Sequence, residues 1–352
     1  MLNKTNWLNI EKHMKILIIG PSWVGDMVMS QSLYITLKKQ YPEARIDVLA
    51  PAWCKAIIEK MPEINSAIEM PIGHGAFDLK QRWKIGRKLK REKYDQAFVL
   101  PNSAKSALIP LFARIPMRTG WKGESRYFLL NDLRPNKRVF QYMVERYVAL
   151  AHSNNNMLDN VTLQSCPYPK LTVSKENQKF AIDRLGLNTE GKIYGLCPGA
   201  EFGPSKRWPE NYYAEITEML ISKGHQVWLF GSQKDNEVTE HIRNRISEKN
   251  QYNCYNLAGK TSLNEAVDLL AACHTVVCND SGLMHVSAAV NCNIVALYGS
   301  TSPEYTPPLT KKLRILHTDH NCRPCFKREC PLGHLDCLKT LSPTEVFKAI
   351  ET

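Results

Sequence analysis

The sequence predicts an α/β protein built from two doubly wound, parallel-sheet domains that face a central cleft. Apolar, β-branched runs of strand length alternate with helical segments through most of the chain. A tract rich in Asn, Pro and Ser at 152–174 interrupts this alternation once, and the alternation then restarts. The length of 352 residues fits two domains better than one.

The first half contains three expected strands, each a short apolar run, at 15–20, 45–50 and 94–101. Helical spacing between them predicts helices at 26–41 and 53–61. Strands that alternate with helices pair in parallel, and the helices cover both faces of the sheet.

The second half repeats this pattern and adds a Ser-Pro-Thr-Glu cap signature before its last segment. Strands are expected at 192–200, 225–232, 275–279 and 293–300, and helices at 209–224, 263–273, 282–290 and 342–350. The predicted organisation is an N-terminal extension (1–13), a first domain with its linker (14–174), a second domain (175–340) and a C-terminal helix (341–352).

The chain is basic, with a formal net charge of +12, which favours an anionic partner. A basic segment at 80–93 has helical spacing, with Trp83, Ile85 and Leu89 expected on its buried side. A solvated surface without a specific role is the alternative explanation of this charge. No motif that interleaves aromatic and basic residues supports nucleic-acid binding, so we expect no nucleic-acid partner.

Membrane spans and secretion signals are not expected. The longest apolar runs have strand length, far short of the roughly 20 residues that a spanning helix needs. The N-terminal segment lacks the continuous apolar region of a signal peptide. The expected compartment is therefore the cytoplasm.

Residues that follow strands are the first candidates for a site, because ligands of open α/β sheets bind at the carboxyl ends of the strands. The loop after the first strand is not GxGxxG, and no acidic residue ends the next strand, which disfavours dinucleotide binding. Asp26 in this loop is either a helix N-cap or a general base on the rim of the cleft. Its position alone favours the cap.

A second candidate loop, at 197–210, follows the first strand of the second domain. It places Lys206 and Arg207 just before a helix that begins near Pro209. Cations are disfavoured at a helix start unless an anion lies nearby, which weakens the alternative of a solvated basic pair. The loop therefore predicts a phosphate site.

The third candidate is "CNDSGLMH" at 278–285. If Asp280 caps the next helix, the first-turn N–H groups of residues 281–283 are available to a ligand, and His285 lies on the same face as Ser281. We expect a clamp for a diphosphate and a sugar, with Asp280 capping the helix or bonding sugar hydroxyls while Lys206 balances its charge. No Asp-x-Asp pair occurs in the chain, so no metal cofactor is expected.

Four of the eleven cysteines, Cys322, Cys325, Cys330 and Cys337, lie outside apolar runs. Their spacing, C-x2-C-x4-C-x6-C, has one C-x2-C pair, whereas four-cysteine zinc sites typically have two. The segment is therefore either a structural zinc site or a cysteine-rich loop without a ligand.

Several long motifs occur in an order that resembles glycosyltransferase family 9, the heptosyltransferases. They are "MKILIIGPSWVGDMVMSQSLY", "LPNSAKSAL", "RTGWKGESRYFLLND", "LCPGAEFGPSKRWPE" and "NDSGLMHVSAAV", from about Met14 onward. The resemblance implies the GT-B fold of two Rossmann-like domains. It implies an inverting, metal-independent transfer of L-glycero-D-manno-heptose from ADP-heptose to the first heptose of the lipopolysaccharide inner core (heptosyl-Kdo2-lipid A), with release of ADP.

The same resemblance assigns roles to residues. Asp26 matches the family's candidate general base, and Lys206 its diphosphate-contacting lysine. The donor-binding set is Ala200, Glu201, Lys206, Arg207, Thr261, Asp280, Ser281, Gly282, Leu283 and His285. The acceptor-binding set is Asn102, Ser103, Lys105, Arg118, Trp121, Lys122 and Arg126.

The implied partners are ADP-heptose and a phosphorylated, lipid-anchored saccharide at the cytoplasmic face of the inner membrane. The protein is expected to be a peripheral monomer there. Two alternatives stay open: heptosyltransferase I or another enzyme of the same family, and a nucleotide-sugar 2-epimerase of the same fold.

Overall fold

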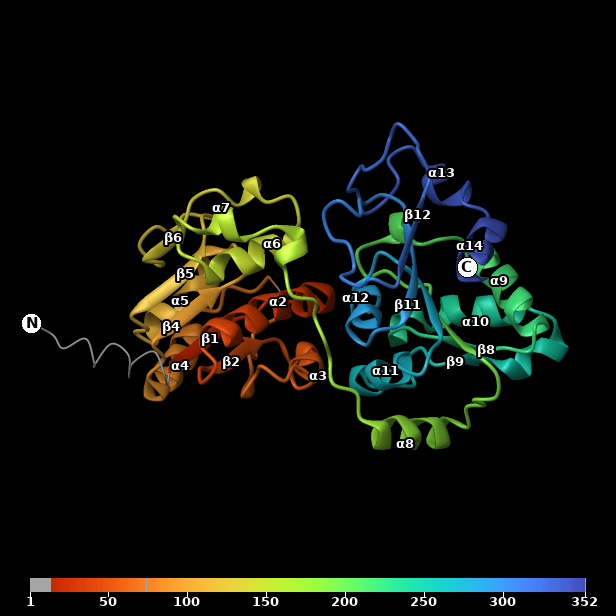
Figure 1. The fold of residues 1–352 in the computed structure, drawn as a ribbon, viewed down its shortest axis with the longest axis horizontal. Coiled ribbons are helices and arrows are strands. Elements are labelled where there is room, and N and C mark those ends of the chain that lie inside the picture. Colours follow the sequence, from red (N-terminus) through yellow and green to blue (C-terminus); the bar gives the residue numbers. More distant parts are fainter. Residues whose placement is uncertain (1–13, 74, 352) are drawn as a thin grey trace, which may run out of the picture. The chain divides into compact units, whose positions relative to one another are not determined.

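The computed structural model describes residues 14–73 and 75–351 and contains two compact units (Figure 1). The first unit ends at Pro169 and the second begins at Lys170, inside the predicted linker tract. The predicted extension 1–13 lies outside the described residues.

The first domain contains a six-stranded parallel sheet in the order β3-β2-β1-β4-β5-β6. The strands are β1 Lys15–Ile19, β2 Arg45–Ala50, β3 Ser66–Glu69, β4 Gln96–Val99, β5 Met117–Trp121 and β6 Asp132–Arg134. The helices are α2 Val24–Gln40, α3 Lys55–Ile58, α4 Leu79–Leu89, α5 Ala104–Phe112, α6 Met143–Val148 and α7 Met157–Asn160.

The second domain, with the same parallel pairing, has the order β12-β11-β10-β7-β8-β9. Its strands are β7 Ile193–Cys197, β8 Gln226–Leu229, β9 Cys254–Asn256, β10 Thr275–Asn279, β11 Asn293–Tyr298 and β12 Leu313–His317. Its helices are α8 Lys175–Leu185, α9 Glu210–Ser222, α10 Asn236–Arg245, α11 Leu263–Leu270, α12 Gly282–Ala289, α13 Asp336–Lys339 and α14 Pro343–Glu351.

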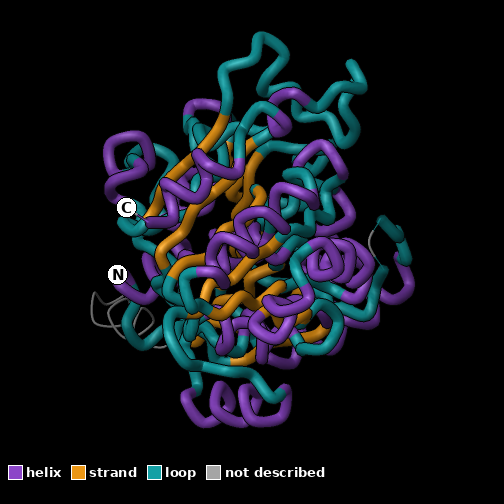
Figure 2. Tube along the Cα trace, turned by 90° about the vertical axis from the view of Figure 1, so that its right-hand side faces the viewer, coloured by secondary structure: helices purple, strands orange, loops and turns teal. Residues whose placement is uncertain are grey.

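Both sheets have the strand order of a Rossmann fold, because the first three strands of each domain run outward to one edge of the sheet and the last three run outward to the other. The central strands are apolar along their whole length: Ile16, Leu17 and Ile18 of β1 are fully buried, as are Val276 and Val277 of β10. Continuous burial is what helices on both faces of a parallel sheet produce. Figure 2 shows the strands inside and the helices around them.

The basic helix α4 buries a different face from the one expected. Leu89 is buried, but Trp83 is 51% exposed. Arg82 and Gly86 occupy the inner face instead. A Cβ atom at position 86 would lie 2.5 Å from the Cβ atom of Phe112 on α5, which is too close for a side chain. The absence of a side chain at this position lets the two helices pack closely, and Trp83 is turned outward.

The C-terminal helix α14 is part of the second domain rather than an appendage. Its Val346 and Ile350 belong to the same core cluster as Leu220 of α9 and Leu297 of β11. Trp208 joins this cluster and donates from its indole Nε1 to the carbonyl of Leu341, 2.9 Å away.

Candidate active site

Each Rossmann sheet has a switch point, where the strand order reverses and the following loops diverge, and ligands of such sheets bind there. In the first domain the switch lies between β1 and β4, so the loops that follow them begin near Gly20 and Leu100. In the second domain it lies between β7 and β10. The predicted Asp26, Lys206 and Asp280 all follow strands that border a switch point.

Asp26 is the third residue of α2 and is half-buried. The N-cap of this helix is Trp23, so the sequence-based preference for Asp26 as the N-cap residue is wrong. A carboxylate in the first turn still interacts favourably with the helix dipole. The alternative role, a general base at the carboxyl edge of the sheet, is compatible with this position.

Tyr147 on α6 donates its hydroxyl to Asp26 Oδ1 over 3.1 Å. The tyrosine ring is 3% exposed, so this donor is fixed by packing. Cys54 lies near the same carboxylate: burial raises the pKa of its thiol to about 12, and the charge of Asp26 adds to that shift. The thiol of Cys54 therefore stays protonated at neutral pH.

Sequence reasoning missed Tyr147, because a tyrosine in the mixed helical segment "MVERYV" has the pattern of an ordinary core residue. Its partner lies 121 residues away in the chain, and no local signal reports that distance.

The predicted acceptor residues fall into two groups. Asn102, Ser103 and Lys105 lie at the start of α5, after β4, and Lys122 is exposed in the loop after β5. Hydrogen bonds tie these loops together: the backbone N–H of Glu124 donates to the carbonyl of Asn102, 3.2 Å away. The Oδ1 atom of Asn102 is buried without a hydrogen-bond partner.

Arg118, Trp121 and Arg126 use their polar groups within the fold. Arg126 is 1% exposed and donates to the carbonyls of Pro101 and Trp121. Burial lowers the pKa of its guanidinium to about 10. Arg118 donates to the carbonyls of Ile115 and Leu129, and the Trp121 indole donates to the carbonyl of Arg146. These three side chains position the loops around them.

In the second domain, Lys206 and Asp280 form an ion pair with Nζ and Oδ2 2.6 Å apart. The two side chains are 13% and 6% exposed. The Thr301 hydroxyl, in the loop after β11, donates to the same oxygen over 2.6 Å. The Lys206 ammonium also lies 4.8 Å from the centre of the Phe202 ring. The expected charge balance between Lys206 and Asp280 is confirmed.

Asp280 does not cap α12, which excludes the first of the two roles that the sequence analysis expected for it. The N-cap is Ser281, with extended backbone and no side-chain cap bond, and the Asp280 carboxylate is directed to Lys206 and Thr301. The physical reason is that an ion pair to a nearby ammonium is stronger than a cap bond. The backbone amides of Gly282 and Leu283, in the first turn of α12, come directly after Ser281.

Asn279, the last residue of β10, holds the Lys206 loop against this helix start. Its fully buried Oδ1 accepts from the Trp208 amide over 3.2 Å and from the Tyr213 hydroxyl over 3.1 Å. Its Nδ2 donates to the carbonyl of Pro198 over 2.7 Å. One amide side chain thus fixes both ends of the loop that carries Lys206. The sequence analysis did not single it out.

His285 lies one turn into α12 and is 5% exposed. Burial lowers the pKa of its imidazole to about 4, with the nearby Lys206 ammonium adding to the shift and Asp280 opposing it. The imidazole is therefore neutral at neutral pH. Lys206, paired with Asp280, is therefore the cation of this corner rather than His285.

The other predicted donor residues lie in loops at the same edge of the second sheet. Ala200 is buried, and its carbonyl accepts from Arg207 over 3.4 Å. Glu201 is exposed and pairs with Lys234 over 2.8 Å. Thr261 is half-buried, just before the N-cap residue of α11.

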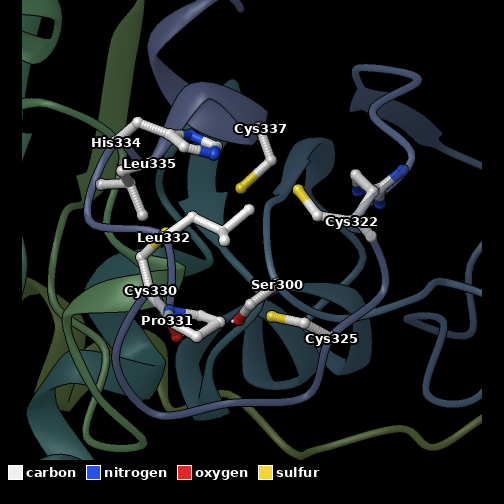
Figure 3. Close-up of a pocket in the computed structure, with 11 residues that line it drawn as sticks. Ser300, Cys322, Cys325, Cys330, Pro331, Leu332, His334, Leu335 and Cys337 are labelled. Atoms are coloured by element: carbon white, nitrogen blue, oxygen red, sulfur yellow. Dashed lines mark hydrogen bonds between the residues drawn. The ribbon is translucent and has the colours of Figure 1, made fainter.

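The cysteine segment forms a small pocket of about 20 Å³, lined by Cys322, Cys325, Cys330 and Cys337 together with His334 and Leu332 (Figure 3). All four are free thiols. In the described part of the chain, no three His, Cys, Asp or Glu side chains gather as a metal ion requires. The zinc site, one of the two possibilities left open for this segment, is therefore not found among the described residues.

Comparison with known proteins decides the family. Residues 82–336 match the family described as glycosyltransferase family 9 (heptosyltransferase). The chain belongs to glycosyltransferase family 9. Its two Rossmann-like domains are those of the GT-B fold that was expected. Both the family and the fold resemblance noted in the sequence are thereby confirmed.

Curated relatives and a solved structure narrow the comparison. Lipopolysaccharide heptosyltransferase 2 of Escherichia coli K12 is 50% identical over 96% of this chain and 97% of its own. Lipooligosaccharide heptosyltransferase 2 of Haemophilus influenzae Rd is 57% identical over 86% and 88%. The structure of the E. coli ADP-heptose LPS heptosyltransferase II aligns with a TM-score of 0.86 at 48% identity, covering 96% and 98%.

The two alternative functions, heptosyltransferase I and a nucleotide-sugar 2-epimerase, have weaker support from these comparisons. Lipopolysaccharide heptosyltransferase 1 of Pseudomonas aeruginosa is 29% identical over 94% of this chain, well below the 50% and 57% of the E. coli and H. influenzae type 2 enzymes. A 2-epimerase activity is not favoured, because the family match and these relatives are glycosyltransferases.

Proposed function

We propose that this glycosyltransferase transfers heptose from ADP-heptose to the first heptose of the lipopolysaccharide inner core and releases ADP. The two type 2 relatives support this substrate pair, and both align over more than four fifths of the chain. The observation that carries the proposal is the Lys206–Asp280 pair beside the start of α12, at the switch point of the second sheet.

The donor half of the reaction needs a group that stabilises the leaving diphosphate. Lys206 has three N–H donors, and one is directed to Asp280, so two remain for phosphate oxygens. The first-turn amides of α12, at Gly282 and Leu283, add the positive end of a helix dipole. Charge that develops on ADP as the glycosidic bond breaks is stabilised by these fixed groups.

The Asp280 carboxylate would repel a diphosphate if it were alone. Lys206 and Thr301 both contact its Oδ2, so its charge is compensated inside the protein. Its role is to hold the Lys206 ammonium at the helix start, with the sugar hydroxyls as further partners of the carboxylate. Arg207, Thr261 and the loop of Ala200 and Glu201 complete the proposed donor set.

The acceptor half needs a base. Asp26 is half-buried, carries a hydrogen bond from Tyr147, and lies at the carboxyl edge of the first sheet. In the proposed single displacement it removes the proton of the acceptor hydroxyl as that oxygen attacks the anomeric carbon. Attack opposite the leaving ADP inverts the anomeric configuration.

The acceptor contacts are proposed for residues of the two segments that follow β4 and β5 at the edge of the first sheet. These are Asn102, Ser103, Lys105 and Lys122, and the two lysines suit the phosphates of an inner-core saccharide. Arg118, Trp121 and Arg126 support these loops through backbone carbonyls. The reaction is proposed to need no metal, because Lys206 and the helix amides supply the positive charge.

An ADP-release assay tests the proposal. The full-length protein should release ADP from ADP-heptose only when heptosyl-Kdo2-lipid A is added, and the product should gain one heptose by mass spectrometry. Kdo2-lipid A without the first heptose serves as the matched control acceptor and should give no ADP. Release with that control, or release without any acceptor, would overturn the assignment.

A further inference from the structure

Five exposed apolar side chains gather on two loops and one helix start of the first domain. They are Phe77 (58% exposed), Leu79 (47%), Trp83 (51%), Tyr127 (55%) and Phe128 (94%). Large apolar side chains this exposed, in two segments that hydrogen bonds join, mark an interaction surface rather than scattered surface residues.

The two loops are joined by hydrogen bonds into one rim. Lys105 Nζ donates to the carbonyl of Gly75 over 2.5 Å, and Arg82 donates back to the carbonyl of Lys105 over 3.2 Å. The amide of Ala104 donates to Glu124 Oε2 over 3.0 Å. The start of α5 therefore connects the loop before α4 to the loop after β5 (Figure 1).

The helix that contributes to this rim is strongly basic on its outer side. Residues 79–93 contain eight Lys or Arg and a single Glu. Arg82 alone is turned inward, where it donates to the carbonyls of Phe77 and Ala76 over 2.6 and 3.0 Å. The exposed cations on the helix are Lys80, Lys84, Arg87 and Lys88, and the Arg87 guanidinium lies 5.7 Å from the Trp83 ring centre.

We propose that this rim, residues 75–88 and 122–128, docks on the surface of an anionic phospholipid bilayer. Tryptophan and phenylalanine side chains insert at the level of the lipid headgroups, and the neighbouring lysines pair with the anionic headgroups. No helix of residues 14–73 and 75–351 is long and apolar enough to cross a membrane. The rim gives the protein a peripheral attachment instead.

The position of the rim links attachment to the reaction; this link rests on the proposed function. Asn102 and Lys105 lie between the two exposed loops, at the same edge of the sheet as the start of α2 with Asp26. A lipid-anchored acceptor held in the bilayer would then present its saccharide to that edge without leaving the membrane. Charge alone would fit a nucleic acid too, but the exposed aromatic and aliphatic side chains favour a lipid surface.

Vesicle flotation of the full-length protein tests the docking. The wild type should float with phosphatidylethanolamine/phosphatidylglycerol vesicles and much less with phosphatidylcholine vesicles. The triple variant Phe77→Ser, Trp83→Ser, Phe128→Ser should bind at least tenfold more weakly. The triple variant Lys80→Gln, Lys84→Gln, Lys88→Gln should lose about fivefold per lysine near the surface, and this loss should shrink at high salt.

The control is Phe180→Ser on α8 of the second domain, whose ring is 66% exposed, and it should float like the wild type. Circular dichroism and urea unfolding confirm that each variant is folded. Wild-type affinity in both triple variants would overturn the proposal, as would failure of the wild type to bind the anionic vesicles. Binding of a DNA duplex that depends on these lysines, without vesicle binding, would overturn it as well.

Turnover separates this inference from the proposed function. With a deacylated, water-soluble acceptor the aromatic variant should keep wild-type kcat/KM, whereas with the acceptor in vesicles its kcat/KM should fall at least tenfold. Equal losses with both acceptors would contradict docking. If the wild type transfers no heptose but the vesicle results hold, the proposed function fails while the lipid surface stands.

Discussion

The buried ion pair between Lys206 and Asp280 gives a prediction whose size follows from the structure. In Lys206→Met the Asp280 carboxylate, 6% exposed, keeps only the Thr301 hydroxyl as a partner. Removing one partner of a buried pair costs about 3–5 kcal/mol of unfolding free energy, because a charge is left uncompensated. The remaining hydrogen bond from Thr301 places the expected loss near the lower end, at about 3 kcal/mol.

The double variant Lys206→Met, Asp280→Asn removes the stranded charge as well as the cation. Its loss should be smaller than that of Lys206→Met alone, about 1–2 kcal/mol, because a neutral amide oxygen still accepts from Thr301. The control is Lys234→Met, which breaks the exposed pair with Glu201 and should leave stability unchanged.

Urea unfolding monitored by tryptophan fluorescence measures all three variants. A loss in Lys206→Met close to zero would show that water or another cation reaches Asp280. A double variant as unstable as Lys206→Met would also refute the reasoning, because the penalty would then come from lost packing and not from the carboxylate.

Three further predictions concern single side chains. In Tyr147→Phe the acidic limb of the kcat/KM profile should move to higher pH by about half to one unit, because a hydrogen bond to the Asp26 carboxylate favours its charged form; an unmoved limb would exclude Asp26 as the titrating base. His285 has a pKa near 4 in the folded protein and about 6.5 when unfolded, so unfolding free energy should fall by about 3 kcal/mol from pH 6.5 to pH 4 through this group. Urea unfolding of His285→Gln at the same pH values should show a decrease in unfolding free energy that is smaller by this amount. Gly86→Ala should cost about 1–3 kcal/mol by overpacking α4 against α5, whereas Gly73→Ala, with open space around it, should be neutral; equal melting would contradict the packing account.

The interior of the fold could be predicted from the sequence, and its edges could not. The expected strand 45–50 coincides with β2, and 275–279 coincides with β10, because apolar and β-branched residues predominate in both. Five outer strands were missed: β3, β5 and β6 of the first sheet, and β9 and β12 of the second. All are short, and β3 and β12 are also partly exposed, with polar residues such as Ser66, Glu69 and Arg314, so their apolar signal is weak.

The candidate site was predictable as far as residue type and topology determine it. Lys206 was expected to balance the charge of Asp280, because a carboxylate beside an anionic diphosphate is unfavourable unless a cation offsets it. The capping role of Asp280 was wrong because its real partners are distant in the chain: Lys206 lies 74 residues away and Thr301 21 residues away. Local cap statistics contain no information about such partners.

The prediction that Trp83 is buried was wrong for a related reason. Helical periodicity identifies an apolar face, but Gly86 and Arg82 determine which face can approach α5. A missing side chain and a buried arginine bonded to carbonyls have no signal in a hydrophobic pattern.

The central claim is that Asp26 is the base of a heptosyl transfer whose donor is bound by the second domain. The most direct measurement compares Asp26→Asn with the wild type in acceptor-dependent ADP release and in ADP binding by calorimetry. We expect kcat to fall by about 10²–10⁴-fold while the Kd for ADP stays within twofold. A kcat within tenfold of the wild type would contradict the account, and so would a parallel loss of ADP affinity.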